Sequence, residues 1–261
     1  MMKKNIYGFI FQKALHSSEN MKWVRIGDII VLNRDVKDPE EFLEMPGVRG
    51  VLLVEGISGS LRKPRVRVLA GECTETIHRE NGCLFRIDLS RVMWSRGNIN
   101  ERARIPGLVE DGETVVDMFA GIGYFSIPVA VHSNPGRVHS IEINPDSFEF
   151  LKSNIELNRV EGVVKPHLGD CRSIAPELDA DRVIMGYVGT THHFLEAALE
   201  CVNEGGVLHY HETVPESIMF SRPIKRIERA AHPRRVSVLD RHVIKKYSPG
   251  VWHVVLDVRV H

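Results

Sequence analysis

The second half of the chain alternates short apolar runs with segments of helical periodicity. Apolar runs that predict strands span residues 114–119, 137–143, 163–168, 182–188 and 205–212. Between them, apolar positions three and four residues apart predict helices over residues 124–132, 144–158 and 192–203. Strands that alternate with helices of this length form a mostly parallel sheet covered by helices on both faces, so we expect an open α/β domain over residues 106–261.

Two of these helices carry signals for their own ends. Asn144 is placed to cap the helix over 144–158, Pro145 falls in its first turn, and Phe148, Leu151 and Ile155 share one face. The pair of glycines at 205–206 predicts the end of the helix over 192–203.

The segments before and after this alternating region have a different pattern of apolar and polar residues. Residues 234–247 and 250–260 alternate with period two around Ser248-Pro249-Gly250, which predicts an antiparallel hairpin at the edge of the sheet. Residues 24–32, 47–55, 64–70 and 81–90 are short β-rich runs separated by turn residues. We therefore expect a small α+β domain with a linker over residues 1–105, in contact with the substrate, ahead of the α/β domain.

Composition narrows the class of protein. The chain has 261 residues, 43% of them hydrophobic and 26% charged, and no apolar run approaches the length of about 18–20 residues that a membrane span needs. The N-terminal apolar run is short and is not followed by a signal-peptide cleavage site. The four cysteines form no CxxC pair. We expect a cytoplasmic protein with reduced thiols, no membrane association and no obligate protein partner.

Positive charge is concentrated in two segments although the net charge is zero. Residues 60–105 hold ten Lys and Arg against five Asp and Glu, and residues 222–246 hold nine against two. The intervening residues 106–221 hold six against eighteen. Clustered Lys and Arg bind phosphate backbones, so the two basic segments, with Arg234 and Arg235 among them, suggest a nucleic-acid partner. The alternative, that both segments are solvated faces, is equally compatible with the charge alone.

A glycine-rich turn follows the first strand of the α/β domain. Residues 117–123 read Asp-Met-Phe-Ala-Gly-Ile-Gly, in which Gly121 and Gly123 let the backbone approach a ligand at a helix N-terminus. A nicotinamide-binding fingerprint needs a third glycine, and this chain has Ser126 there. The form is that of the first motif of S-adenosylmethionine-dependent transferases.

Two carboxylates at later strand ends support the same cofactor. Glu142 ends the second strand, 21 residues after Gly121, where it can accept hydrogen bonds from both ribose hydroxyls. Asp170 follows the third strand and is placed to accept from the adenine amino group. Ligands bind at the carboxyl edge of such sheets, so the sequence predicts S-adenosylmethionine as co-substrate and no metal. His209 and His211 are two residues apart on one strand but lack a third ligand for a metal.

From about Gly27 to the end, the chain resembles the tRNA position-37 enzymes of archaea and eukaryotes. These comprise the guanosine N1-methyltransferases and their paralogue, the archaeal-type aminocarboxypropyltransferase of the wybutosine pathway. The resemblance is carried by residues 79–90, 94–104 (WSRGNINERAR), 117–128, 141–158 and 181–188. It implies a Rossmann-like class I methyltransferase fold, mostly parallel with a C-terminal antiparallel hairpin, preceded by the small α+β domain.

Two departures favour the aminocarboxypropyltransferase. At the end of the fourth strand, the methyltransferases carry an Asn-Pro-Pro or Asn-Leu-Pro type motif, and here the residues are Met185-Gly186-Tyr187-Val188. The segment Ser95-Arg96-Gly97-Asn98, followed by Glu101-Arg102, is similar to the pattern of the paralogue. The resemblance implies transfer of the 3-amino-3-carboxypropyl group to carbon 7 of 4-demethylwyosine at position 37 of tRNA(Phe), with the anticodon stem-loop as partner and methylthioadenosine as by-product.

Candidate site residues follow from the motifs and the resemblance together. We expect cofactor contacts from Ser95, Arg102, Asp117, Phe119, Gly121, Gly123, Glu142, Asp170 and Cys171. Arg102 is a candidate to pair with the cofactor carboxylate, or alternatively to bridge the two domains, and Glu101 is a candidate proton acceptor. Two alternatives stay open: N1-methylation of guanosine 37, and a non-catalytic tRNA-binding module that retains the cofactor.

Overall fold

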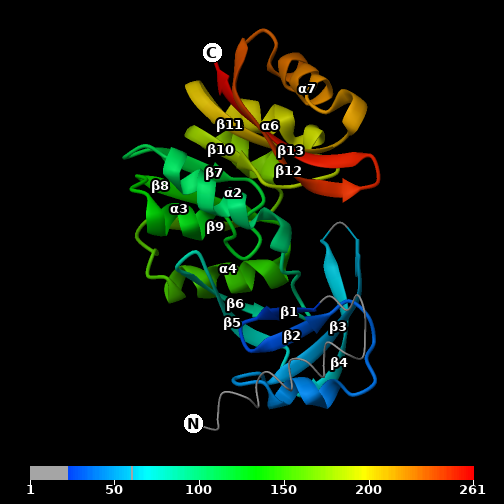
Figure 1. The fold of residues 1–261 in the computed structure, drawn as a ribbon. Coiled ribbons are helices and arrows are strands. Elements are labelled where there is room, and N and C mark those ends of the chain that lie inside the picture. Colours follow the sequence, from blue (N-terminus) through cyan, green and yellow to red (C-terminus); the bar gives the residue numbers. More distant parts are fainter. Residues whose placement is uncertain (1–22, 60) are drawn as a thin grey trace, which may run out of the picture. The chain divides into compact units, whose positions relative to one another are not determined.

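The computed structural model describes residues 23–59 and 61–261, and they fall into two compact units (Figure 1). The smaller unit contains the described residues up to His78 together with Ile87–Met93, and the larger unit contains Arg79–Arg86 and Trp94–His261. The N-terminal apolar run considered above lies outside the described residues. No helix in the described part of the chain is long and apolar enough to cross a membrane.

The smaller unit is built on a four-stranded sheet in the order β1-β2-β3-β4. Its strands are β1 (Trp23–Ile26), β2 (Ile29–Leu32), β3 (Gly50–Ser58) and β4 (Lys63–Gly71), and the β2–β3 pair is the parallel one. The 3-10 helix η1 (Pro39–Glu44) packs Phe42 against Ile30, Leu32 and Leu53. A separate two-stranded sheet contains β5 (Glu75–Glu80) and β6 (Cys83–Asp88).

The larger unit contains a seven-stranded sheet in the order β12-β13-β11-β10-β7-β8-β9. The strands are β7 (Thr114–Asp117), β8 (Arg137–Glu142), β9 (Val164–Leu168), β10 (Ala180–Met185), β11 (Val202–Pro215), β12 (Val236–Ser248) and β13 (Val251–Val260). Strands β7 to β11 are parallel, whereas β13 lies between β11 and β12 and is antiparallel to both. The chain order reverses between β7 and β10, which is the point where open α/β sheets bind ligands. The predicted α/β fold with its C-terminal hairpin is confirmed.

Helices cover both faces of this sheet (Figure 1). They are α2 (Ile99–Arg104), α3 (Ser126–His132), α4 (Pro145–Leu157), α5 (Cys171–Ile174), α6 (Leu195–Cys201) and α7 (Ser221–Ala231), with short 3-10 turns η2 (Arg96–Asn98), η3 (Ile105–Leu108), η4 (Ala175–Glu177), η5 (Thr191–Phe194) and η6 (Glu216–Ile218). On one face, α5, α6 and α7 pack into a core with Val183, Leu208 and Leu256. Burial of such side chains supplies most of the stability of a domain of this size.

Helix α4 shows how the sequence sets a boundary. The Asn144 side chain accepts a hydrogen bond from the Asp146 backbone N–H at 3.0 Å, and Pro145 occupies the first turn, as predicted. The apolar face differs in one position from the expectation, because Phe150 is buried and Phe148 is only partly buried.

Two features of the C-terminal half differ from the expectation. Helix α6 ends at Cys201, and the glycines at 205–206 lie within β11 instead, where Gly205 has a φ of +80° and the pairing with β10 shifts register. Strand β11 begins before these glycines, at Val202, whose side chain is buried in the core. The sequence analysis also assigns no helix to residues 221–231, which form α7.

Candidate cofactor and active site

The glycine-rich turn after β7 is shaped by Asp117, which is fully buried. Its carboxylate accepts hydrogen bonds from the Ser126 hydroxyl at 2.7 Å and the Phe119 backbone N–H at 3.3 Å. Burial raises the pKa of Asp117 to about 6, against the opposing effect of these hydrogen bonds. Asp117 therefore fixes the backbone of the turn through these hydrogen bonds, and its side chain is not exposed at the surface.

Gly121 and Gly123 adopt backbone conformations that side chains rarely allow. Their φ angles are +58° and +99°. A Cβ atom on Gly123 would lie 2.5 Å from Ile127 Cγ1, and one on Gly121 would lie 2.7 Å from the Tyr124 ring. The positive φ angles and the close packing of Tyr124 and Ile127 therefore require glycine at both positions of this turn, called the glycine cradle below, and its contact with a nucleoside stays a prediction.

Glu142 connects this turn to the end of β8. Its carboxylate accepts from the backbone N–H of Gly121 at 2.7 Å and of Asn144 at 2.6 Å. Burial raises the pKa of Glu142, and the two hydrogen bonds partly offset that shift. Ile143 follows directly and is 53% exposed, an apolar side chain at the rim that the sequence analysis does not single out. The sequence feature that could have identified Ile143 is its position next to a carboxylate at the end of a strand.

Asp170 and Cys171 follow β9, the strand next to β8. Asp170 caps α5 by accepting from the Arg172 backbone N–H at 2.9 Å, and its side chain pairs with the Arg172 guanidinium. Hydrogen bonding to Arg172 lowers the pKa of Asp170. Burial raises the pKa of the Cys171 thiol to about 12, so this sulfur is a protonated, apolar neighbour and not a nucleophile. Asp170 and Glu142 therefore end adjacent strands at the same edge of the sheet, as expected.

An aromatic cluster joins the ends of β7 and β10. The ring of Phe119 stacks on Tyr187, with centroids 5.1 Å apart, and meets Phe194 edge-on at 4.9 Å. The Arg172 guanidinium lies 5.3 Å from the Phe194 ring centroid. Tyr187 and Phe194 are absent from the predicted site residues, because pairing between segments so far apart in the chain leaves no local signal.

Gly186 lies against the ring of Phe125 at the end of β10. A Cβ atom on Gly186 would be 2.6 Å from Phe125 Cε2, and Phe125 is itself buried and meets the His211 ring at a centroid distance of 5.7 Å. The space beside residue 186 is therefore filled by an aromatic ring, and a side chain at this position would require the Phe125 ring to shift.

Arg102 is buried and its donors are engaged within the larger unit. Its Nε and Nη2 donate to the two oxygens of Glu80 at 2.6 and 2.8 Å, and its Nη1 donates to the Ser95 carbonyl at 2.7 Å. The rings of Trp94 and Tyr124 lie 5.2 and 5.4 Å from its guanidinium carbon. This geometry gives Arg102 a part in positioning Ser95, while its pairing with a cofactor carboxylate stays a prediction.

Glu101, the candidate proton acceptor, is also buried. Both of its oxygens accept from Arg104, with Nη2 at 2.8 Å from Oε2 and Nε at 3.0 Å from Oε1. Arg104 in turn binds Asp257 on β13. The carboxylate is therefore fixed in orientation by a residue that the sequence analysis does not select.

The basic segment over residues 222–246 contains both exposed and engaged cations. Arg234 donates to the carbonyls of Leu199, Val202 and Asn203, so it caps the end of α6. Arg234 is thus engaged within the larger unit, and its contact with nucleic acid stays a prediction. Lys245 on β12 is exposed and lies against Gly97, where a Cβ atom would be 1.7 Å from its Nζ.

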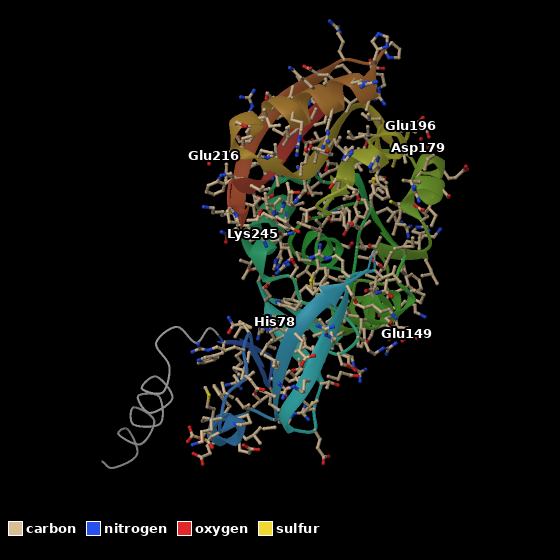
Figure 2. All side chains as sticks on the ribbon, turned by 90° about the vertical axis from the view of Figure 1, so that its right-hand side faces the viewer. His78, Glu149, Asp179, Glu196, Glu216 and Lys245 are labelled. Carbon is tan, nitrogen blue, oxygen red and sulfur yellow. The ribbon has the colours of Figure 1, made fainter. Side chains whose placement is uncertain are left out.

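The larger unit carries exposed charges of both signs. Figure 2 shows the exposed carboxylates of Asp179 and Glu196 on one side, and Lys245 together with the carboxylate of Glu216 on the other. The exposed cations of α7 and β12 are Lys225, Arg229, Arg241, Lys245 and Lys246. On β4 of the smaller unit, Lys63, Arg65 and Arg67 are exposed as well, and Arg67 pairs with Asp35 and Glu55.

The histidines of β11 take part in side-chain pairs. His209 contacts Asp257 and Arg182, and His211 Nδ1 lies 3.1 Å from His253 Nε2. Within residues 23–59 and 61–261, no group of three His, Cys, Asp or Glu side chains is placed to hold a metal ion.

The sheet order, the glycine cradle and the strand-end carboxylates together define the class I S-adenosylmethionine-dependent transferase fold. A family model described as the TRM5/TYW2 methyltransferase domain matches residues 76–239. The chain belongs to this family, which confirms the resemblance found in the sequence.

Individual relatives match over nearly the whole chain. A protein of Methanocaldococcus jannaschii named tRNA(Phe) (4-demethylwyosine(37)-C(7)) aminocarboxypropyltransferase is 46% identical over 244 residues, which cover 92% of this chain and 98% of the relative. The crystal structure of M. jannaschii TYW2 in complex with AdoMet has a TM-score of 0.78 at 42% identity, covering 92% of this chain and 99% of that one. The crystal structure of P. horikoshii TYW2 in complex with MeSAdo has a TM-score of 0.84 at 37% identity and covers 99% of both chains.

Proposed function

We propose that this protein transfers the 3-amino-3-carboxypropyl group of S-adenosylmethionine to carbon 7 of 4-demethylwyosine at position 37 of tRNA(Phe). The observation that carries the proposal is the likeness to an aminocarboxypropyltransferase over 98% of that relative's length. The by-product is methylthioadenosine, and the P. horikoshii relative crystallises in complex with MeSAdo.

The residue at the end of β10 supports the choice between the two reactions of the family. Methyltransferases place an asparagine side chain there, beside the methyl group. Gly186 has no side chain, and the ring of Phe125 occupies the adjoining space. The amide that serves methyl transfer is missing, and its replacement by glycine favours transfer of the larger group.

The chain's own residues divide the work of holding the cofactor. Glu142 and Asp170, at adjacent strand ends, hold the ribose and adenine, and the Gly121–Gly123 backbone admits the nucleoside closely. The sulfonium of S-adenosylmethionine activates each carbon attached to it, so the group transferred depends on which carbon faces the acceptor. The Ser95 segment, held by Arg102 and Glu80, orients the methionine half.

The tRNA contacts follow the distribution of charge. The exposed cations of β12 and α7, including Lys225, Lys245 and Lys246, form a phosphate-binding surface for the anticodon stem-loop. Of these, Lys245 lies on the side of the larger unit away from Asp179 and Glu196 (Figure 2). The smaller unit carries the exposed cations Lys63, Arg65 and Arg67 on β4, and these cations contact the tRNA as well.

The test uses tRNA that carries 4-demethylwyosine and S-adenosylmethionine labelled separately in its methyl group and its aminobutyrate carbons. The tRNA product is digested to nucleosides, and their masses are measured by mass spectrometry. Aminobutyrate label on the tricyclic base is the expected result. Methyl label on guanosine 37 of an unmodified transcript identifies the protein as a methyltransferase instead, and binding of both substrates without transfer of either label identifies a non-catalytic module.

A further inference from the structure

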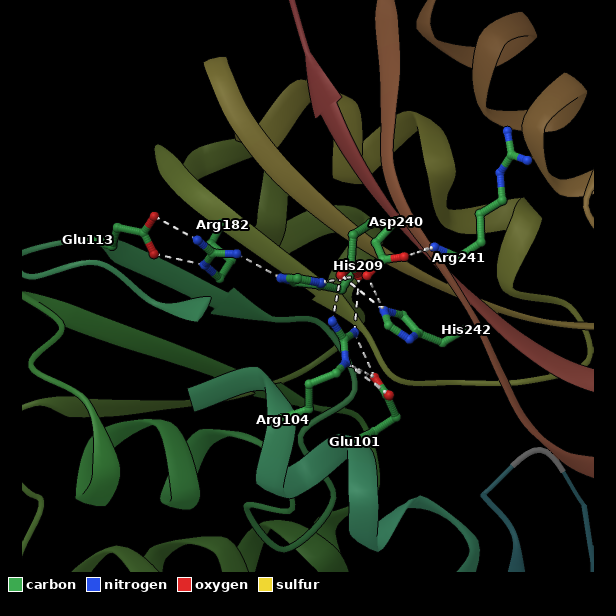
Figure 3. A network of polar contacts seen from close by, with 9 residues as sticks. Glu101, Arg104, Glu113, Arg182, His209, Asp240, Arg241 and His242 are labelled. Atoms are coloured by element: carbon green, nitrogen blue, oxygen red, sulfur yellow. Dashed lines mark hydrogen bonds and ion pairs between the residues drawn. The ribbon is translucent and has the colours of Figure 1, made fainter. Parts of the chain in front are cut away.

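A line of buried polar side chains crosses the larger unit from α2 to the start of β7 (Figure 3). From Glu101 it passes to Arg104, then to Asp257 at 2.6 Å between Arg104 Nη1 and Asp257 Oδ2. Asp257 Oδ1 lies 2.6 Å from His209 Nδ1. The line connects the candidate proton acceptor to the centre of the sheet.

The far half of the line fixes the state of His209. Arg182 Nη1 lies 2.8 Å from His209 Nε2, and Arg182 binds Glu113 through Nε at 2.7 Å and Nη2 at 2.9 Å. A guanidinium only donates, so His209 Nε2 accepts and the proton resides on Nδ1, which donates to Asp257. His209 is therefore a neutral imidazole in one tautomer. Burial lowers its pKa, against the raising effect of Asp257, in agreement with this assignment.

The charges in this line do not balance. Glu101, Asp257 and Glu113 contribute three negative charges, and Arg104 and Arg182 contribute two positive ones. Burial would raise the pKa of Asp257, but hydrogen bonds from His209 and Arg104 hold it well below its ordinary range. Asp257 therefore stays ionised, and Arg104 is shared between it and Glu101, to which Arg104 donates through Nε and Nη2.

We propose that Arg104, Asp257 and His209 are positioning residues for Glu101, holding its carboxylate in the orientation that takes the proton of carbon 7. This inference rests on the proposed function for the identity of the acceptor. As the carbon–carbon bond forms at carbon 7 and the carbon–sulfur bond of the cofactor breaks, the carbon 7–hydrogen bond gives its electron pair back to the ring and its proton passes to Glu101. Arginine does not release its proton in proteins, so the line conveys charge and orientation and is not a proton wire.

The surroundings of Asp257 contain one more titratable group. His242 on β12 lies 3.7 Å from Asp257 Oδ2 and 3.1 Å from Asp240 Oδ2. Its side chain is partly exposed and that of Asp240 largely so, so this is where the line meets solvent. On β11, His211 contacts Phe125, which fills the space beside Gly186.

A double-mutant cycle on the transfer rate tests the proposal. Glu101→Gln is expected to lower kcat by roughly 100- to 1,000-fold, the range of general-base catalysis. Asp257→Asn is expected to lower kcat about 10-fold with KM unchanged for both substrates, and Asp257→Glu to restore most of the loss. In the Glu101→Gln background, Asp257→Asn is expected to change kcat less than about 2-fold. An equal loss in both backgrounds overturns the proposal, as does an unchanged kcat for Glu101→Gln.

A second buried network supplies the matched control. Glu212 accepts from Arg226 at 2.6 Å and from Arg222 at 2.8 Å, and these arginines come from α7. Arg226→Gln lowers stability without touching the line, so it is expected to change kcat equally little in both Glu101 backgrounds. If Asp257→Asn does not fold, His209→Asn, which retains a donor for Asp257, is measured with an expected loss of about 3-fold only when Glu101 is present. Equal loss in both backgrounds overturns the proposal here too.

The identity of the transferred label distinguishes a failure of the proposed function from a failure of the positioning role of Asp257. If methyl is transferred, the proposed function fails while the cycle is still read from the rate of label transfer. If aminobutyrate is transferred and the cycle is additive, the function stands and the positioning role of Asp257 is rejected.

Discussion

Replacing Gly186 by alanine introduces one methyl group where the structure has no space for it. The new Cβ atom would lie 2.6 Å from Phe125 Cε2 and 3.0 Å from Cδ2. Phe125 is 3% exposed and its ring is held against His211, so it does not swing into solvent. Extra methyl groups in a packed core cost about 1–3 kcal/mol, and alanine restores about 0.4–1 kcal/mol by restricting the unfolded chain. The net expected loss is about 1–2 kcal/mol.

This loss is measured as a change in the free energy of unfolding by urea and as a lower Tm. For a unit of this size, about 1–2 kcal/mol corresponds to a drop of roughly 2–8 °C. Gly162→Ala is the matched control, because no atom lies within 4 Å of its new Cβ, and it is expected to be neutral or slightly stabilising. Phe125→Leu combined with Gly186→Ala is expected to be less destabilised than the sum of the two changes. If Gly186→Ala is as stable as Gly162→Ala, the reasoning about this contact is wrong.

Three further changes have expected outcomes. Glu142→Ala weakens S-adenosylmethionine binding about 10- to 100-fold by calorimetry, because hydrogen bonds to a charged acceptor contribute about 1.5–3 kcal/mol; unchanged affinity in the folded variant removes Glu142 from the site. The pKa of His253 is lowered to about 4 by burial, below about 6.5 in the unfolded chain, so stability is full above about pH 6.5 and falls as the pH drops toward 4. The free energy of unfolding falls by about 2 kcal/mol by about pH 5, and urea titrations of His253→Gln are expected to show a weaker pH dependence. An unchanged pH dependence in this variant contradicts the role given to His253. Replacing Lys245 and Lys246 by Gln reduces the salt dependence of tRNA binding by about 0.7–0.9 for each phosphate that is no longer bound, and an unchanged slope makes them a solvated face.

The sequence predicts the α/β sheet because the alternation of its strands and helices repeats locally. Alternation of strands and helices, the cap at Asn144 and the strand-end position of Glu142 each depend on neighbouring residues in the chain. The glycines of the cradle have φ angles that only a turn of that kind requires. Each of these features is encoded within a few residues and is therefore predictable, and the structure confirms them.

What the sequence does not predict depends on contacts between distant segments. Arg102 follows closely after Asn98, but its partner Glu80 lies 22 residues away, so its engagement leaves no pattern in the motif. Arg234 suggests a nucleic-acid contact because charge is visible in the sequence, whereas the three carbonyls it caps are not. Asp257 lies 153 residues from Arg104, and only the fold brings them together.

The central claim is that the aminocarboxypropyl group moves and the methyl group stays. A single turnover with tRNA carrying 4-demethylwyosine, followed by chromatography of the released nucleoside, tests it most directly. The account predicts methylthioadenosine in a one-to-one ratio with modified base. S-adenosylhomocysteine together with a methylated guanosine in plain transcript contradicts it.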